Sequence, residues 1–195
     1  MVGRLQDLLR RSNPFQSAYL NSELVTRLRQ MEPHETNATQ KFLLRVQLAV
    51  QLMRAGLTAE SLAEFDNLPA FAQANKLRVG PNEEHLLQLE RGLACLRLGE
   101  QENCLLNHNS DSCLFPIQGD GFHKLPGGSR AAIGMFRLML EAQPNDLGAR
   151  WLLNVAHMTL GEYPDKVPKQ FLIPPSAFAS EYPLPRFPEA AAAGG

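Results

Sequence analysis

Neither sign of charge predominates in this sequence. Its 195 residues include 19 basic and 20 acidic side chains, which leaves a formal net charge of −1 at pH 7. A chain this close to neutrality has no overall field that would draw it to nucleic acid or to an anionic membrane. The composition therefore predicts no nucleic-acid partner.

Long apolar runs and alternating β-branched runs are both missing. No segment approaches the roughly 20 consecutive apolar residues that a bilayer span requires. The opening "MVGRLQDLLRRSN" lacks the continuous apolar stretch of a secretory signal. Alternating runs of Val, Ile and Thr, which are typical of strands, do not occur either. We therefore expect no direct membrane insertion, no signal peptide in this chain, and an all-α fold.

The apolar residues that are present recur at helical spacing. One such stretch runs from Phe42 to Met53, and Gly56 is predicted to follow its last turn as the left-handed residue. Thr58 is predicted to cap the next helix, which Pro69 would kink or end. The same period returns in residues 83–100, 129–146 and 147–162.

The helix ends show an internal repeat. "ACLRLGE" (residues 94–100) and "AHMTLGE" (residues 156–162) share Ala, Leu, Gly and Glu, and "LMRAG" fits more loosely. Superposing these segments predicts helix ends at Gly56, Gly99 and Gly161. A residue small enough for a close helix neighbour stands seven positions before each: Ala49, Gly92 and Asn154. This pattern is typical of tetratricopeptide hairpins, whose ideal period is about 34 residues.

We therefore predict a tetratricopeptide-like helical domain over residues 1–163, with a long inserted loop at residues 101–128. From Pro164 onward the helical period is lost and prolines become frequent. Residues 164–195 are predicted to form an extended, Pro-rich tail or linker. Its aromatic and aliphatic side chains are too apolar for a solvated segment, so we expect the tail to pack on the helices.

The inserted loop gathers cysteine, histidine, aspartate and glycine, yet no metal or nucleotide motif in it is complete. A calcium loop beginning at Asn107 would have Ser112 in place of glycine and Gln118 in place of the bidentate glutamate. The short Cys-x-x-Cys pair of a zinc site is missing. The segment "PGGSRAA" lacks the Lys-Ser/Thr of a phosphate loop, and Ser129 in it is therefore predicted to be a helix cap. We expect no cofactor and no metal. A metal-dependent or hydrolytic site in the 104–129 loop, centred on His108, Asp111 and His123, remains the alternative.

The three cysteines fall into two groups. Cys104 and Cys113 are separated by "LLNHNSDS", whose Asn, Ser and Asp residues favour a turn that would bring the two thiols together. We expect a disulfide between them, which would require an oxidising compartment, and two reduced thiols are the alternative. Cys95 lies within a helical pattern and is predicted to be a buried thiol.

Several segments resemble one bacterial family. These are "LGEQENC…SCLFPI…GSRAAI", "RWLLNVAHMTLGEYPDKVPKQFLIPP" and "FASEYPLPRFPEAA". They are similar to the N-terminal helical region of FG-GAP/VCBS-repeat proteins with an ASPIC/UnbV domain, the cartilage-acidic-protein-like group. The resemblance implies a tetratricopeptide-like region before a β-propeller, export from the cytoplasm, a Cys104–Cys113 disulfide and no catalytic residue. The propeller would begin where this chain stops, so we expect a truncated member or a separately encoded subunit.

We accordingly predict a non-enzymatic protein–protein interaction or scaffold module of an extracytoplasmic (periplasmic or secreted) assembly. Its partner would be its own propeller domain or another subunit of a larger assembly. A cytoplasmic tetratricopeptide scaffold with reduced cysteines is a further alternative. If repeat geometry holds, the positions predicted to face a partner-binding groove are Val46, Val50, Met53, Leu89, Leu93 and Leu96.

Overall fold

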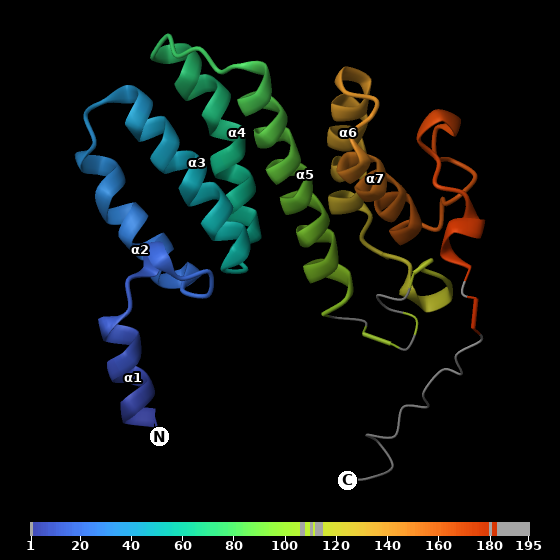
Figure 1. Ribbon diagram of the computed structural model, residues 1–195, viewed down its shortest axis with the longest axis horizontal. Coiled ribbons are helices and arrows are strands. Elements are labelled where there is room, and N and C mark those ends of the chain that lie inside the picture. The colour runs from blue at the N-terminus through green and yellow to red at the C-terminus, as the bar shows by residue number, and fades with distance from the viewer. Residues whose placement is uncertain (1, 106–107, 110, 112–114, 180, 183–195) are drawn as a thin grey trace. The chain divides into compact units, whose positions relative to one another are not determined.

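A computed structural model describes residues 2–105, 108–109, 111, 115–179 and 181–182. No strand occurs among these residues, so the predicted all-α class is confirmed (Figure 1). No described helix is long and apolar enough to cross a bilayer. The α-helices are α1 (Val2–Arg11), α2 (Asn21–Met31), α3 (Ala38–Arg54), α4 (Thr58–Ala74), α5 (Pro81–Asn103), α6 (Gly127–Ala142) and α7 (Leu147–Thr159). Short 3-10 turns are η1 (Pro14–Gln16), η2 (Glu32–His34), η3 (Gly119–Gly121), η4 (Lys169–Phe171) and η5 (Pro175–Phe178).

Two of the three helix ends that were predicted at glycines are confirmed. Gly56 and Gly161 have φ values of +83° and +64°, a backbone conformation that costs glycine little because it has no Cβ. The N–H of Gly56 donates to Met53 O at 3.0 Å, and the next N–H, that of Leu57, donates to Leu52 O at 2.9 Å. This pair of hydrogen bonds is the Schellman arrangement. The corresponding two bonds follow α7.

Three local predictions are wrong: the helix end at Gly99 and the helix caps at Thr58 and Ser129. Gly99 lies inside α5, since that helix continues to Asn103. Thr58 is the first residue of α4 rather than its cap, and Pro69 sits within α4 without ending it. Ser129 lies in the first turn of α6, whose cap position is Pro126. The tetratricopeptide character of the hairpins stays a prediction.

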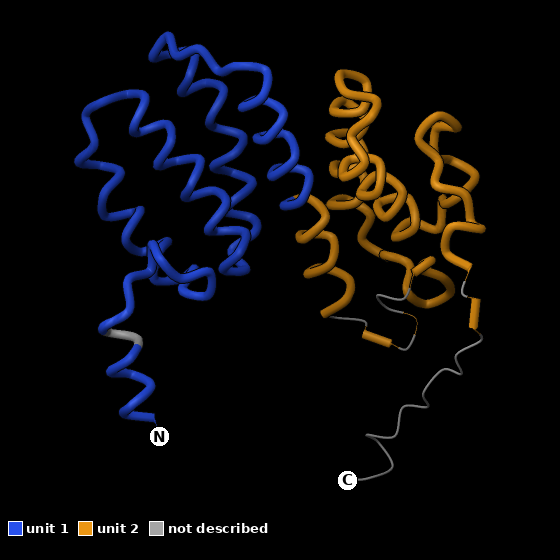
Figure 2. The backbone as a smooth tube through the Cα atoms, in the orientation of Figure 1, with its two compact units in different colours: residues 1–94 blue, residues 95–195 orange. Residues whose placement is uncertain are grey.

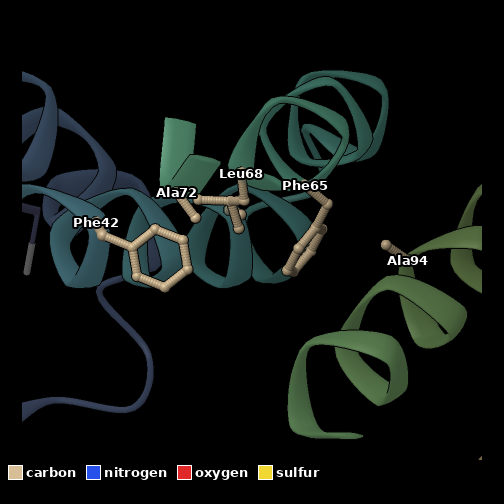
Figure 3. Close-up of a cluster of buried hydrophobic side chains, with 6 residues drawn as sticks. Phe42, Phe65, Leu68, Ala72 and Ala94 are labelled. Carbon is tan, nitrogen blue, oxygen red and sulfur yellow. The ribbon is translucent and has the colours of Figure 1, made fainter. Parts of the chain in front are cut away.

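The chain divides into two compact units, residues 1–94 (unit 1) and residues 95–195 (unit 2), shown in separate colours in Figure 2. In unit 1, α3 lies between α2 and α4 and buries a different face against each. The cluster between α2 and α3 contains Leu24, Val25, Leu28, Leu48 and Leu52. The cluster that α3 shares with α4 and the end of the unit contains Phe42, Ala49, Phe65, Leu68, Ala72 and Ala94 (Figure 3).

Small residues allow α3 and α4 to approach closely. Ala49 is fully buried, and its carbonyl oxygen accepts a hydrogen bond of 2.7 Å from Ser61 Oγ on α4. A side-chain hydroxyl can reach a helix carbonyl across the interface only where neither residue is bulky. The small residue expected seven positions before Gly56 is therefore placed at a helix–helix contact.

Unit 2 is built around α6 and α7, which pack against each other. Close approach of α6 to α5 depends on Gly128, where an added Cβ would lie 2.5 Å from Gly99 N and 2.6 Å from Cys95 O. Backbone atoms occupy that space, so no larger residue fits without a shift. Gly99, predicted to end a helix, thus serves instead as a contact surface.

The first part of the proline-rich tail docks on α7, as expected. Asn154 is fully buried; its Nδ2 donates to Phe171 O at 2.9 Å, and its Oδ1 accepts from Ile173 N at 3.0 Å. Phe178 packs against the rings of Trp151 and Tyr163, with centroids 5.7 and 5.9 Å away. The end of the tail, residues 183–195, lies outside the described residues.

Candidate functional site

Four side chains that are distant in sequence meet in unit 2. Cys104 directly follows α5, and His123 stands in the connection that leads to α6. Ser129 comes from the first turn of α6, and Thr159 is the last residue of α7. The backbone fixes the histidine at this meeting point, because His123 N donates to Thr159 O at 2.7 Å.

The imidazole of His123 has a partner on each ring nitrogen. Nδ1 lies 3.0 Å from Ser129 Oγ, and Nε2 lies 3.8 Å from Cys104 Sγ. The histidine is 9% exposed and the cysteine is half-buried. We call Cys104 and His123 the thiol–imidazole pair.

A chain of hydroxyl groups continues behind the imidazole. Thr159 Oγ1 lies 2.7 Å from Ser129 Oγ and 2.8 Å from Ala156 O. Ser129 and Thr159 are both buried, so these contacts satisfy groups that water does not reach. The series therefore runs from the sulfur through the ring and two hydroxyls to a helix carbonyl.

An asparagine closes the connection that carries the pair. Asn103 Nδ2 donates to Leu125 O at 2.9 Å, and its Oδ1 accepts from Leu125 N at 2.8 Å. The same amide group also donates to Gly99 O at 2.8 Å. The side chain thus bonds both backbone groups of Leu125 and holds the two ends of the connection together.

A second polar group in unit 2 is centred on Glu162. This carboxylate is only 6% exposed, and Arg130 Nη1 and Nη2 donate to its two oxygens at 2.6 and 2.7 Å. Lys166 Nζ donates to Oε1 at 2.7 Å. Hydrogen bonds from Arg130 outweigh the opposing effect of burial and, with Lys166, lower the pKa of Glu162 to about 2. The carboxylate is therefore charged at neutral pH.

His157 is buried beside this carboxylate. Its Nδ1 lies 3.3 Å from Glu162 Oε2, but the contact does not have hydrogen-bond geometry. Neither ring nitrogen has a hydrogen-bond partner within the described part of the chain. Burial lowers the pKa of His157, and the negative charge of Glu162 only partly offsets it. The ring is therefore neutral at pH 7.

Burial also lowers the pKa of His123, while the charge of Glu100 on α5 acts in the opposite direction. At neutral pH this imidazole is consequently in its basic form. The two buried histidines of unit 2 thus share a protonation state but differ in surroundings, because His123 has a polar partner on each nitrogen.

The residues of the alternative metal or hydrolytic site have different surroundings. His108 is exposed, and Asp111 N donates to Asn109 Oδ1 at 2.9 Å within the loop. His123 is turned instead toward Cys104 and Ser129. No group of three or more His, Cys, Asp or Glu residues in the described segments is placed to hold a metal ion.

The expected disulfide cannot be traced, because Cys113 lies outside the described residues. No disulfide occurs within the described part of the chain. The Cys104–Cys113 pairing stays a prediction. Cys95 is buried in α5, as its helical pattern indicates.

The six residues predicted to face a groove are placed differently on their two helices. Those on α3 are half-buried and pack against the larger apolar cluster of unit 1: Val46, Val50 and Met53. Those on α5 range from half-buried to buried: Leu89, Leu93 and Leu96. Their role in binding a partner stays a prediction.

Sequence reasoning misses most of the polar residues of unit 2. It assigns Ser129 to a helix cap and gives no role to Thr159, Glu162 or Arg130. The repeated "LGE" segment contains Glu162, so a carboxylate directly after a helix-ending glycine is the available signal. Nothing in the local sequence indicates that Arg130, from another helix, pairs with it.

The chain matches no protein-family model, no curated protein and no solved structure. The resemblance to FG-GAP/VCBS and ASPIC/UnbV proteins therefore rests on the quoted segments alone.

Proposed function

We propose that this protein is a non-enzymatic helical interaction module and that the apolar face of α1 is its docking surface. The observation that carries the proposal is the exposure of Val2, Leu5 and Leu8, which are 69%, 60% and 57% exposed. Positions spaced by three residues lie along one side of a helix. Three large apolar side chains on one face of a short helix are typical of a segment that binds in a groove.

Charge on the same helix indicates the chemistry of the partner. Arg4 and Arg11 lie off the apolar face and outnumber Asp7. A groove that buries the three apolar side chains would therefore be matched by carboxylates along its edges. Burial of each Leu or Val side chain contributes roughly 1.5 to 3 kcal/mol before the costs of association. We infer a protein partner with an apolar groove bordered by acidic residues.

A photocrosslinking experiment tests this surface. The photoreactive residue p-benzoylphenylalanine replaces Leu5 in one chain. In a matched control it replaces Gly3, on the opposite side of the helix, where an added Cβ meets no atom within 4 Å. We expect a protein adduct from position 5 in cells of the source organism and none from position 3. Leu8→Asp should abolish the adduct, since it places a charge within the docking face.

Four outcomes would contradict the proposal. Adducts of equal yield from both positions would show nonspecific proximity. Lipid adducts from position 5 would identify a membrane surface, and adducts with a second copy of the chain would identify self-association. A lack of any adduct at position 5 would show that the face has no partner under those conditions.

The extracytoplasmic setting and the relation to propeller-containing proteins belong to the same proposal. Their support is the sequence resemblance and the expected Cys104–Cys113 bond. Detection of propeller repeats in the same coding region would strengthen the relation. Recovery of the native protein only from the cytoplasm, with both thiols alkylatable, would contradict the setting.

A further inference from the structure

The thiol–imidazole pair has a chemistry that an interaction module does not need. We propose that Cys104, in chains where it is not bonded to Cys113, is a reactive thiol activated by His123, and that it is then a modification site for small disulfides such as oxidised glutathione. The inference is independent of the docking surface on α1, because it depends only on residues of unit 2.

The first support is the direction of the imidazole. His123 Nε2 is the ring nitrogen nearest the sulfur, at 3.8 Å, and a sulfur–nitrogen contact of this length is suited to proton exchange between thiol and ring. The ring packs against the backbone of α5, since a Cβ added at Gly99 would lie 3.3 Å from Nδ1. The backbone bond to Thr159 O holds the residue itself.

The second support is the hydroxyl behind the ring. A serine hydroxyl can either donate or accept, so Ser129 Oγ can partner Nδ1 of both the neutral and the protonated imidazole. Thr159 can adjust in the same way between Ser129 Oγ and Ala156 O. The chain therefore stabilises the imidazolium that forms when the ring takes a proton, and Ser129 acts as a positioning residue.

The surroundings of His123 keep the ring neutral before the reaction. Burial keeps His123 neutral at pH 7, and Glu100, itself 2.8 Å from Arg97, is the carboxylate whose field acts on the ring. Arg130 of α6 and Glu162, which follows α7, are paired with each other. The ring is thus available to accept a proton and is not already charged.

The reaction conserves atoms and electrons without a further reagent. The Cys104 S–H bond breaks, and its proton passes to His123 Nε2. The thiolate attacks one sulfur of the small disulfide, a new S–S bond forms, and the old S–S bond breaks. The leaving thiolate takes the proton from His123. One mixed disulfide and one small thiol result, and the imidazole returns to its neutral form.

Access distinguishes Cys104 from the other described cysteine. Cys104 is half-buried and is followed by Leu105, which is 78% exposed. Cys95 is 5% exposed within α5. Cys104 is therefore less buried than Cys95, and Cys95 provides an internal control for unfolding.

The test follows mixed-disulfide formation in reduced full-length chains that carry Cys113→Ser, so that the adduct at Cys104 persists. Oxidised glutathione is the probe, and peptide mapping by mass spectrometry after an acid quench gives a rate for each cysteine. At pH 7 we expect folded Cys104 to react about tenfold faster than in urea, where its thiol has an ordinary pKa near 8.5. Cys95 should react only after unfolding.

Two variants test the roles of the partners. His123→Gln should slow Cys104 about tenfold at pH 7 and move its rate–pH curve to that of the unfolded thiol. Ser129→Ala keeps the imidazole base of His123 but removes the hydroxyl partner of its Nδ1. The rate–pH curve of Cys104 should therefore move in the same direction by a smaller amount. The matched control is His108→Gln, an exposed histidine in the same loop, which should leave rate and curve unchanged.

A rate for folded Cys104 at or below that of the unfolded chain would overturn the proposal. So would an unshifted rate–pH curve in His123→Gln when circular dichroism shows that the variant is folded. If that variant does not fold, the curve of folded Ser129→Ala decides the matter in its place. If these residues had a purely structural role, the substitutions would lower the melting temperature and leave the rate–pH curve of Cys104 unchanged.

Discussion

Residues 1–94 and residues 95–195 bury different kinds of side chain between their helices. In unit 1 the helices meet through aliphatic and aromatic clusters, and ion pairs such as Arg29–Glu60 lie at the surface. In unit 2 the ends of α6 and α7 meet through Ser129, Thr159 and the Arg130–Glu162 pair. The same helical architecture is thus stabilised mainly by apolar burial in one unit and by apolar burial plus buried polar groups in the other.

The difference determines what a change in sequence or pH does. An apolar interface loses stability in proportion to the volume removed and is indifferent to pH. A buried polar interface depends on every partner, because a donor or acceptor left without one costs more than its hydrogen bond contributed. We therefore expect the largest single-residue polar effects, and the main acid sensitivity, in unit 2.

Asn154→Ala is expected to have the largest effect of the changes considered. It removes the amide that bonds Phe171 O and Ile173 N, so Ile173 N loses its side-chain partner, while Phe171 O keeps a hydrogen bond of 3.1 Å from Arg150 Nε. We expect a loss of about 3 kcal/mol in the free energy of unfolding, measured by urea denaturation. Asn67→Ala is the matched control, because Asn67 on α4 is exposed and bonds only its own helix at Ala63 O. A similar loss in both variants would break the comparison.

Gly128→Ala should come next. Its new Cβ would lie 2.5 Å from Gly99 N, so α5 and α6 must separate, at a cost of about 2 kcal/mol. Gly134 is on the same helix, and a Cβ added there would have no atom within 4 Å, so Gly134→Ala should stabilise the protein by about 0.5 to 1 kcal/mol. Thermal unfolding of the two variants checks both signs. Equal effects would show that the α5–α6 contact is not close.

Acidification should destabilise unit 2 in two stages. His157 and His123 have lowered folded pKa values, so their contribution is complete above the unfolded pKa near 6.5 and declines as the pH falls below it. Glu162 has a pKa of about 2, so its contribution is present above about 4.5 and is lost as the pH falls toward 2. We expect a combined loss of about 1 to 2 kcal/mol between pH 7 and pH 3.

Two variants isolate these stages. The stability difference between the wild-type chain and Glu162→Gln should shrink below pH 4.5, the ordinary pKa of a glutamate carboxyl. The difference for His157→Gln should change between pH 7 and pH 5 instead. Chemical denaturation across this range is the measurement. Differences that stay constant with pH would show that neither group is coupled to folding.

Ser61→Ala is the smallest change and probes the buried hydrogen bond between α3 and α4 in unit 1. It removes the hydroxyl that donates to Ala49 O at 2.7 Å. We expect a loss of about 1 kcal/mol, since the alanine fits the same space. Ser22→Ala, at an exposed site on α2, should change stability by no more than about 0.5 kcal/mol. A loss as large as that of Asn154→Ala would mean that unit 1 also depends on buried polar contacts.

The sequence predicted the helices well because an apolar period and a glycine after the last turn are local signals. Gly161 illustrates this, since its left-handed backbone directly follows the last turn of α7. Gly99 has the same neighbours as Gly161, a leucine before it and a glutamate after it, yet α5 continues through it. The helix continues where α6 packs against it, and that contact involves Gly128, which is far away in sequence.

The candidate site was predicted only in part for the same reason. The loop was recognised by its cysteines and histidines, and His123 and Cys104 both lie in it. Their real partners, Ser129 and Thr159, look like an ordinary helix start and helix end in sequence. A hydrogen bond between α6 and α7 leaves no periodic signal, so only the folded chain reveals which polar residues face each other.

The side-chain bridge from Asn103 to Leu125 has a consequence for how this loop can change in length. The Asn103 amide group bonds Leu125 and so closes the loop at its base. The positions of α5 and α6 therefore depend on this closed junction and not on the number of residues in the loop. The entropic cost of closing such a loop grows only slowly with its length, by about 0.6 kcal/mol for each doubling. Residues inserted before Phe122, an epitope tag or a natural expansion alike, should thus leave α5 and α6 undisturbed.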